Sequence, residues 1–406
     1  MSAHDHSQSG RPPILIAGAG IGGLTAALAL ARAGQSVTLL EKRTRLTEVG
    51  AGLQLSPNAS RVLIGLGLGP ALARAACEPD RIVVRRGGDA ATLAEMPLGR
   101  MRERFGAPYY VIHRADLQTI LFDAVRGTSG IRLAFGREVA LAETVEAGVR
   151  VTSQTAGGPE TLTGNCLIGA DGLWSRVARA MGDDSEPDFI GYVAWRGTMP
   201  IEAAPVAFRG TQTGLWLGRG CHVVHYRVSG GRQLNVVAVL HDANSEPGWS
   251  REGDAAAFRA RVGPWAAPAL RELIEAVPEW QVWSLFDRRP RKRWIKGRVA
   301  LLGDAAHPVL PFLAQGGACA IEDAAVLADL VAENPSDPAA ALPAYELLRR
   351  PRASALQAAA RKNGRIYHMA GPMALARDFV MRRKGGEALM RGYDWVYSWT
   401  AGDGRG

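Results

Sequence analysis

The sequence has little that would place the protein outside the cell or in a membrane. Its four cysteines, Cys77, Cys166, Cys221 and Cys319, lie far apart and form no C-x-x-C pair. This usage is typical of a reduced protein and not of a disulfide-stabilised secreted domain. No signal peptide is visible and residues 1–13 are polar. We therefore expect a disordered N-terminus and a cytoplasmic location.

Long hydrophobic runs are also scarce. The uncharged run Ile14–Ala31 is long enough to be considered as a membrane span. Four glycines occupy its first ten residues, and a strand-like pattern follows it. We therefore reject the span and expect no membrane partner.

Aromatic residues make up only 7% of the 406 residues, and acidic residues are outnumbered, which leaves a net charge of +9. The densest basic run is Arg288–Arg298. A nucleic-acid site usually adds a known module or stacked aromatic residues, and this run contains only Trp294. We expect a solvated basic loop, with docking of a nicotinamide phosphate as the alternative, and no nucleic-acid partner.

A strand–helix–strand unit near the N-terminus is the clearest local pattern. Ile14–Ala17 reads as a buried strand, Gly23 to about Arg32 as a helix and Val37–Leu40 as a second strand. Between the first strand and the helix, the glycines Gly18, Gly20 and Gly23 form G-x-G-x-x-G. This combination is typical of a dinucleotide-binding fold.

Each residue type in this pattern suits nucleotide binding for a chemical reason. Gly18 allows the tight turn, Gly20 lets a pyrophosphate approach the backbone, and Gly23 lets helix and strand pack closely. The helix N-terminus offers free N–H groups and the positive end of its dipole. Glu41 ends the second strand, where a carboxylate can accept hydrogen bonds from a ribose diol.

Further along the chain, elements of both kinds follow. Strand patterns from Gly182 to Phe286 are separated by glycine-rich turns and predict an antiparallel sheet inserted into the nucleotide domain. We also predict strands at 109–114, 131–135, 149–154, 166–170 and 298–304, and helices at 58–66, 115–125, 175–181, 316–332 and from 339 onward. A further helical stretch, 255–276, is interrupted by Pro264 and Pro268, and an aromatic tail, 393–399, packs on the core or on a partner subunit.

Three patterns now occur in order along the chain. The first is the unit from Gly18 to Glu41, the second is Gly169–Gly172, and the third is Gly303–Pro308 followed by Gln315–Gly317. With these motifs the chain resembles the class A FAD-dependent aromatic hydroxylases, which share the para-hydroxybenzoate hydroxylase fold. The segments YVAWRG (192–197), HVVHYRV (222–228) and DWVY (394–397) resemble the branch of salicylate hydroxylase, 3-hydroxybenzoate 6-hydroxylase and 6-hydroxynicotinate 3-monooxygenase.

The resemblance implies an α/β fold: a Rossmann-like FAD-binding domain with an inserted antiparallel-sheet substrate domain and C-terminal helices. We predict the following division: 14–80, 106–182 and 287–335 for the FAD-binding domain, 81–105 and 183–286 for the substrate domain, and 336–406 for the C-terminal helical region. The protein would be a monomer or a homodimer.

The resemblance also implies the cofactor, a non-covalent FAD, and its binding residues. Asp304 follows an apolar strand and matches the acid that binds the ribityl chain. Asp171 belongs to a motif associated with both FAD and the nicotinamide nucleotide, although either acid could instead cap a helix. The full predicted set is Gly18, Gly20, Ile21, Gly22, Gly23, Glu41, Lys42, Gly52, Arg114, Val139, Asp171, Asp304, Gly316 and Gly317.

The implied reaction needs NADH or NADPH, O2 and a small aromatic substrate. NAD(P)H reduces FAD, oxygen adds to give a C4a-hydroperoxyflavin, and its distal oxygen is transferred to a phenolic or N-heteroaromatic ring, which we expect to carry a carboxylate. A flavoprotein of the same fold that oxidises or reduces its substrate without oxygen insertion is the alternative. A third hypothesis is a flavin-binding sensor without turnover.

Ring activation needs a base, and the segment 221–226 contains the candidates. Side chains of a strand alternate between its faces, so His222 and Tyr226 share one face while Cys221 and His225 share the other. The two histidines therefore do not chelate together, and we expect no metal. We predict that His222 and Tyr226 act on the substrate and that His225 is structural.

The wall of the pocket follows the third motif. Pro311 and Phe312 stand where relatives often carry a polar side chain, and they suit a dry wall that keeps water from the flavin. Ordinary core packing is the alternative. Arg196 remains as the candidate for a substrate carboxylate, and His307, beside Asp304, reads as structural or as a border of the pocket.

Overall fold

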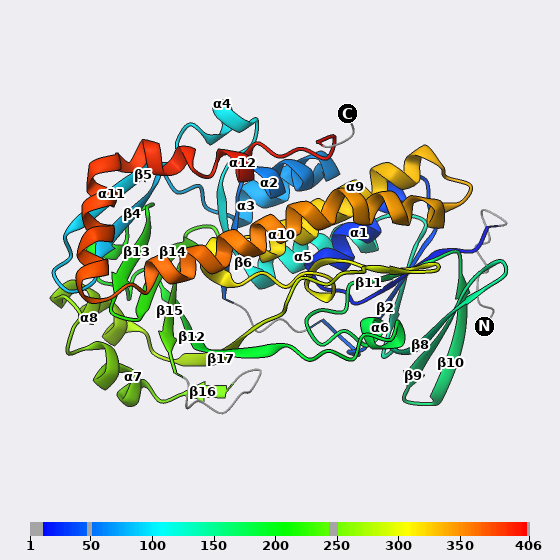
Figure 1. The fold of residues 1–406 in the computed structure, drawn as a ribbon, viewed down its shortest axis with the longest axis horizontal. Helices are drawn as coiled ribbons and strands as arrows, with labels where there is room; N and C mark the ends of the chain where they lie inside the picture. The colour runs from blue at the N-terminus through cyan, green and yellow to red at the C-terminus, as the bar shows by residue number, and fades with distance from the viewer. Residues whose placement is uncertain (1–10, 47–50, 243–250, 404–406) are drawn as a thin grey trace.

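The computed structural model describes residues 11–46, 51–242 and 251–403. Of the segment 1–13 that was predicted to be disordered, residues 1–10 lie outside the described residues. Residues 11–13 are described, and the carbonyl of Pro13 accepts the N–H of Asn165 at 2.8 Å. Figure 1 shows an elongated molecule in which the helix α10, Leu342–Tyr367, runs lengthwise between a parallel sheet near one end and a large antiparallel sheet near the other. Within the described ranges, no helix combines the length and the apolar character needed to cross a membrane.

A six-stranded sheet forms the centre of the nucleotide-binding half. All its neighbouring strands are parallel except the short edge strand β18. Every residue of β1 and β19 is buried, as expected for strands that are covered on both faces. The strands are β1 Ile14–Ala17, β2 Val37–Glu41, β7 Ile131–Phe135, β11 Leu167–Gly169, β18 Ile295–Lys296 and β19 Val299–Leu301, in the order β18-β19-β11-β1-β2-β7.

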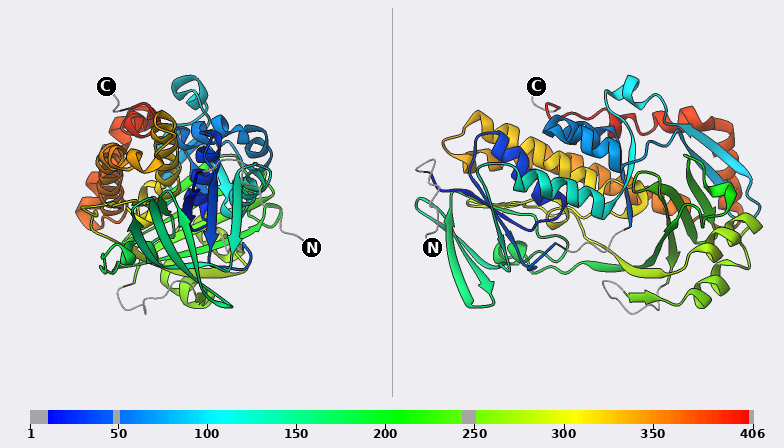
Figure 2. Two further views of the ribbon diagram at one scale, coloured as in Figure 1. Left: turned by 90° about the vertical axis from the view of Figure 1, so that its right-hand side faces the viewer. Right: turned by 180° about the vertical axis from the view of Figure 1, so that it is seen from behind.

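Helices cover one side of this sheet, and a second small sheet lies on the other side (Figure 2). Helix α1, Ile21–Arg32, packs against α5, Arg114–Arg126, and α9, Gly316–Glu333. The small sheet is an antiparallel meander, and α6 packs against its first strand. Its elements are β8 Glu138–Val145, β9 Gly148–Thr155 and β10 Gly158–Gly164, with α6 at Arg176–Ala180.

An eight-stranded sheet forms the other half. It is antiparallel except where β13 runs parallel to β4. Its order is β16-β17-β12-β15-β14-β13-β4-β5, with β4 Arg81–Arg86, β5 Thr92–Pro97, β12 Asp188–Pro200, β13 Thr213–Gly218, β14 Cys221–Val228, β15 Gln233–His241, β16 Arg251–Gly253 and β17 Trp280–Asp287.

The two faces of this sheet bury different partners. One face packs on α7, Ala255–Val262, and α8, Pro268–Ala276, through Phe258 and neighbouring aliphatic side chains. The other face packs on Phe312 and on Ala360 of α10. This second face is the one that reaches toward the nucleotide-binding half.

The remaining elements connect the two halves. Two short strands pair into a ribbon between the sheets, and the C-terminal helices return over the molecule (Figure 1). These elements are β3 Gly52–Leu55, β6 Tyr110–His113, α2 Pro57–Leu63, η1 Ile64–Leu68, α3 Gly69–Ala75, α4 Met101–Phe105, η2 Val206–Phe208, η3 Gly303–Ala305, η4 Pro311–Leu313, η5 Pro338–Ala341, α11 Gly371–Arg391 and α12 Asp394–Tyr397.

The predicted elements are largely present, and the predicted α/β fold class is confirmed. The helical stretch predicted over 255–276, with its interruption by Pro264 and Pro268, is present as two helices, and Pro268 stands in the first turn of the second, α8. The aromatic tail packs on the core, where Val396, Tyr397 and Trp399 are buried. Strands β4 and β5 pair within the large sheet, which is in line with the predicted domains, although the domain division itself stays a prediction.

Candidate active site

The turn between β1 and α1 has the geometry that its glycines predict. Gly18 has φ +100°, and a Cβ there would lie 2.5 Å from the carbonyl oxygen of Ala170. A Cβ on Gly23 would lie 1.9 Å from the carbonyl oxygen of Gly18. By contrast, no described residue lies within 4 Å of a Cβ placed on Gly20, so this side of the turn is open to an approaching ligand.

Glu41, at the end of β2, is hydrogen-bonded to the same turn. The Oε2 atom of Glu41 accepts the backbone N–H of Ala19 at 2.8 Å, and its Oε1 atom accepts that of Arg43 at 2.9 Å. These bonds fix the carboxylate beside the glycine-rich turn. Lys42 is exposed, 3.9 Å from the carboxylate of Glu138, and Val139 is buried.

A cavity of about 330 Å³ opens where the two halves of the molecule meet. It is bordered by the glycine-rich turn, the ribbon β3–β6, the N-terminus of α9 and the inner face of the large sheet. Its lining includes Gly20, Ile21, Gly22, Gly52, Arg114, Arg196, His222, Tyr226, Asp304, Pro311, Gly316 and Gly317. The structure thus brings together most of the predicted site residues; Gly18, Gly23, Glu41, Lys42, Val139, Asp171 and Phe312 are not part of this lining.

Two helix N-termini face this cavity. Helix α1 begins at the open turn around Gly20, and α9 begins at Gly316, and no side chain in the described part of the chain caps either helix. Their first N–H groups lack partners within the helix, so both ends are suited to anionic or carbonyl oxygens.

Asp304 reaches the cavity from the short helix η3. Its side chain is open to the cavity but surrounded by protein on its other sides, and this burial raises the pKa of the carboxyl group, opposed by the charges of His307 and Arg114. A ligand that donates hydroxyl groups to the carboxylate would stabilise its ionised form. A ribityl chain offers such hydroxyl groups.

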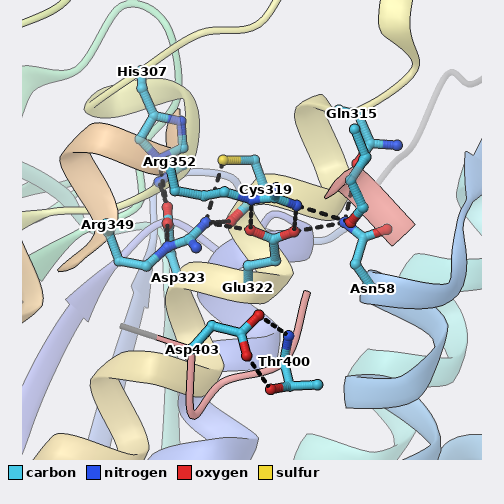
Figure 3. Close-up of polar contacts among 12 residues, drawn as sticks. Asn58, His307, Gln315, Cys319, Glu322, Asp323, Arg349, Arg352, Thr400 and Asp403 are labelled. Atoms are coloured by element: carbon cyan, nitrogen blue, oxygen red, sulfur yellow. Dashed lines mark hydrogen bonds and ion pairs between the residues drawn. The ribbon is translucent and has the colours of Figure 1, made fainter. Parts of the chain in front are cut away.

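A buried ionic cluster holds the turn that carries Asp304 (Figure 3). Asp323 of α9 accepts the backbone N–H of Gly303 at 3.0 Å, the ring of His307 at 2.5 Å and the Nε–H of Arg349 at 2.7 Å. Burial alone would raise the pKa of Asp323, but the charges of His307 and Arg349 hold it at about 2. Burial also lowers the pKa of His307, and Asp323 raises it well above its ordinary value.

The same cluster joins α9 to two other helices. Glu322 accepts hydrogen bonds from Arg349 at 2.7 Å and Arg352 at 2.9 Å, both on α10, and from Asn58 of α2 at 2.6 Å. Gln315, just before α9, accepts a further bond from Asn58 at 3.0 Å. The N-terminus of α9 is therefore fixed from both sides.

Three members of this cluster, His307, Cys319 and Asp323, lie close enough to share a metal ion. Both oxygens of Asp323 already accept hydrogen bonds, and the guanidinium of Arg349 lies against Asp323 and Cys319. A second cation would be repelled there, so we read these residues as a hydrogen-bonded support for the Asp304 turn. His307, which does not line the cavity, belongs to this support.

Strand β14 presents the predicted catalytic pair. His222 and Tyr226 line the cavity, whereas His225 packs on the opposite face against Phe208 and Trp216. The regular pairing of β14 with β13 and β15 contains no bulge that would bring both histidines to one side. The predicted division of faces is what the structure shows.

Burial controls the protonation of this pair. It lowers the pKa of His222 well below 6.5, with a smaller effect from the neighbouring His368, and it raises that of Tyr226. At neutral pH, His222 is therefore a neutral imidazole that can accept a proton, and Tyr226 is a neutral phenol that can donate a hydrogen bond.

One partner of His222 was missed in the sequence. The Nε2 atom of His368 lies 2.8 Å from the Nδ1 atom of His222, although the residues are 146 positions apart. No local pattern marks His368, because it stands just beyond the C-terminus of α10 and reaches the sheet only through the path of that helix.

Arg196 lines the cavity, and no acidic side chain among the described residues pairs with it. Burial lowers its pKa to about 10, and the nearby Arg114 adds to the effect while Tyr226 opposes it. Its guanidinium lies 5.1 Å over the ring of Trp283. Among the described residues, no group accepts a hydrogen bond from its buried Nε atom.

Two predicted residues have other contacts. The carboxylate of Asp171 accepts the hydroxyl of Ser175 at 2.6 Å and the N–H of Val177 at 3.0 Å, so it supports the start of α6, as the alternative reading anticipated. Its predicted contact with a nucleotide stays a prediction. Phe312 lies behind the lining, with its ring centroid 5.8 Å from that of His222.

These features fit a bound FAD. The open glycine turn and the end of α1 would hold its pyrophosphate, Glu41 its ribose, Asp304 its ribityl chain and the start of α9 its flavin ring. Three other side chains of the lining, those of Arg196, His222 and Tyr226, would be available to a substrate.

Comparison with known proteins agrees with this fit. The family described as "FAD binding domain" matches residues 11–360. The chain is 34% identical over 392 residues to 3-hydroxybenzoate 6-hydroxylase of Polaromonas naphthalenivorans (strain CJ2), which covers 96% of this chain and 97% of that protein. It is 37% identical over 393 residues to 3-amino-4-hydroxybenzoate 2-monooxygenase of Streptomyces cremeus, covering 96% and 95%.

A solved structure gives the same result. The crystal structure of Klebsiella pneumoniae HpxO complexed with FAD and uric acid matches with a TM-score of 0.82 and 29% identity, over 96% of this chain and 97% of that one. The predicted resemblance is thereby confirmed, and the cofactor is FAD. The chain belongs to the class A FAD-dependent aromatic hydroxylases, a family of monooxygenases.

Proposed function

We propose that the protein hydroxylates an aromatic ring that carries both a phenolic hydroxyl and a carboxylate, with NADH or NADPH as reductant and O2 as the oxygen source, in the cytoplasm. The observation that carries this proposal is Arg196. It is a buried cation of the lining whose Nε atom has no acceptor among the described residues. A carboxylate from the substrate would supply one.

The strand register supports the position of such a substrate. Arg196 on β12 pairs with Val237 on β15, and Val237 pairs with Val224 on β14, between His222 and Tyr226. Paired residues share a face, and two strand spacings amount to roughly 10 Å. A benzoate ring placed over Val237 would direct its carboxylate toward Arg196 and its hydroxyl toward the His222–Tyr226 side.

The side chains would then divide the work. His222 accepts the proton of the phenolic hydroxyl, which makes the ring electron-rich, and Tyr226 donates a hydrogen bond to the same oxygen. Pro311 and Phe312 keep water from the reacting atoms. Bound FAD, once reduced, would supply the activation of O2, and the oxygen atom added to the ring would come from O2.

The relatives are in line with this substrate class. The names of the two relatives above contain the compounds 3-hydroxybenzoate and 3-amino-4-hydroxybenzoate. Each of these compounds carries a hydroxyl and a carboxylate on one ring.

The test is substrate selectivity in Arg196→Met. Charge-assisted hydrogen bonds contribute about 1.5–3 kcal/mol, so the KM for 3-hydroxybenzoate should rise roughly 10- to 150-fold. The KM for phenol, which lacks the carboxylate, should change little. The control is Arg85→Met. Like Arg196 on Trp283, Arg85 stacks on a tryptophan, Trp216, but it lies on the opposite face of the sheet.

Equal changes for both substrates in Arg196→Met would contradict the assignment. NAD(P)H consumption that yields an oxidised or reduced product without an added oxygen atom would favour the alternative flavoprotein reading.

A further inference from the structure

A second cavity lies behind His222. It has a volume of about 460 Å³, and its lining includes Tyr192, His241, His368 and two arginines. His368 borders this outer cavity and not the inner one, whereas His222 borders only the inner one. The hydrogen bond between their rings, 2.8 Å long, therefore joins the two cavities.

The packing around His368 holds its ring in place. The ring stacks on that of Tyr192, with centroids 4.8 Å apart and planes 18° from parallel. The ring of Phe312 meets its edge, with centroids 5.4 Å apart. Its backbone N–H bonds to the carbonyl of Gly364 at 3.2 Å, which ties the residue to the last turn of α10. The side chain is half-buried, so it meets both protein and solvent.

We propose that His368 is a relay residue that takes the substrate proton from His222 and passes it to water in the outer cavity. The proposal rests on the proposed function, because it concerns the proton of a phenolic substrate. It gives the buried base an exit for the proton that does not lead through the inner cavity, where water must be kept out.

The transfer balances as a chain of single proton steps. The substrate O–H bond breaks as an N–H bond forms at Nε2 of His222, and the Nδ1–H bond of His222 breaks as one forms at Nε2 of His368. The Nδ1–H bond of His368 then breaks, and its proton passes to water in the outer cavity. No electrons move, and the reverse transfer restores both rings when the product oxygen takes up a proton.

The surroundings of His368 favour release of a proton from its ring. Burial, His241 on β15 and Arg377 on α11 lower the pKa of His368 to about 4. His222 and Tyr192 face the same ring, and Arg219 and Arg261 border the outer cavity. Both histidines are therefore neutral at pH 7, each with one N–H group and one lone pair, as a relay requires.

The first test needs no substrate. In protein labelled with ¹⁵N-histidine, His222 should show a protonated Nδ1 hydrogen-bonded to an unprotonated Nε2 of His368. His368→Phe keeps a ring against Tyr192 and Phe312 but removes both nitrogens, and it should abolish that signature. A spectrum in which Nδ1 of His222 is unprotonated and Nε2 of His368 carries the proton would overturn the proposed direction of transfer.

The second test measures proton release. FAD-loaded protein is mixed with 3-hydroxybenzoate in weak buffer with an indicator dye. A general base contributes roughly 10²–10⁴-fold, so loss of its relay should slow proton release about 10-fold or more. In His368→Phe, FAD content and the Kd for 3-hydroxybenzoate should stay near those of the unmodified protein. Unchanged proton release in His368→Phe would overturn the proposal.

Chemical rescue separates a relay from a merely structural role. In His368→Ala, imidazole added to the outer cavity should restore fast proton release, and methylimidazoles should do so according to their basicity. Pyrrole has the same shape but no basic lone pair, and it should restore nothing; equal rescue by pyrrole would overturn the proposal. If 3-hydroxybenzoate is not hydroxylated at all, the proposed function fails, and the NMR test still decides the relay.

Discussion

Arg349 offers a sharp test of how the ionic cluster stabilises the FAD-binding turn. Its side chain is 1% exposed and bonds to Glu322 and Asp323, each at 2.7 Å. Removing one partner of a buried ion pair costs about 3–5 kcal/mol, because a charge is left unpaired. Since Arg352 and His307 remain beside the two carboxylates, we expect Arg349→Met to lose about 3 kcal/mol of unfolding free energy.

The next residue of the same helix is a matched control. Arg350 is 44% exposed and pairs with Glu346 at 2.9 Å. An exposed pair is worth about 0–1 kcal/mol, so Arg350→Met should change stability little. Methionine and arginine have similar helix propensities, so the difference between the two variants reports the buried charges.

Urea unfolding followed by tryptophan fluorescence measures both variants. The pKa of Asp323, about 2, lies below its ordinary value of 3.8, so its contribution to stability is present above pH 3.8 and is lost as the pH falls toward 2. In Arg349→Met this pKa rises, so the deficit should be greatest near neutral pH and shrink on acidification. A loss no larger than that of Arg350→Met would refute the reasoning.

Other predictions concern the cofactor and the base. Asp304→Ala should weaken FAD binding more than Asp171→Ala does, because Asp304 faces the cavity while Asp171 supports α6; equal FAD titrations would count against this. His222→Ala should slow ring hydroxylation roughly 10²–10⁴-fold and divert oxygen to peroxide. His225→Ala should mainly lower the melting temperature, and if it alone uncouples turnover, the wrong face has been assigned. Because burial lowers the pKa of His222, kcat/KM should stay level as the pH falls through 6.5, and a decline centred there would contradict it.

The parts of the fold that depend on neighbouring residues could be predicted from the sequence. The spacing of Gly18, Gly20 and Gly23 after an apolar strand indicates a dinucleotide turn because each glycine answers a local steric need. The same holds for the faces of β14, where alternation alone places His222 with Tyr226 and His225 opposite.

Features that depend on the path of the chain could not be predicted. The strands β8 and β10 were missed because, apart from the buried Val139, most of their side chains are half-buried or exposed, which leaves no continuous apolar stripe. The contact between His222 and His368 depends on where α10 ends. The row that joins Arg196 to β14 depends on the register of β15, which a single sequence does not reveal.

The central claim is tested most directly by ¹⁸O₂ incorporation during turnover of 3-hydroxybenzoate with NADH or NADPH. The account predicts one ¹⁸O atom in each hydroxylated product and one product for each NAD(P)H consumed. Consumption of NAD(P)H that yields only peroxide with every carboxylated phenol tested, or a product without ¹⁸O, would contradict it.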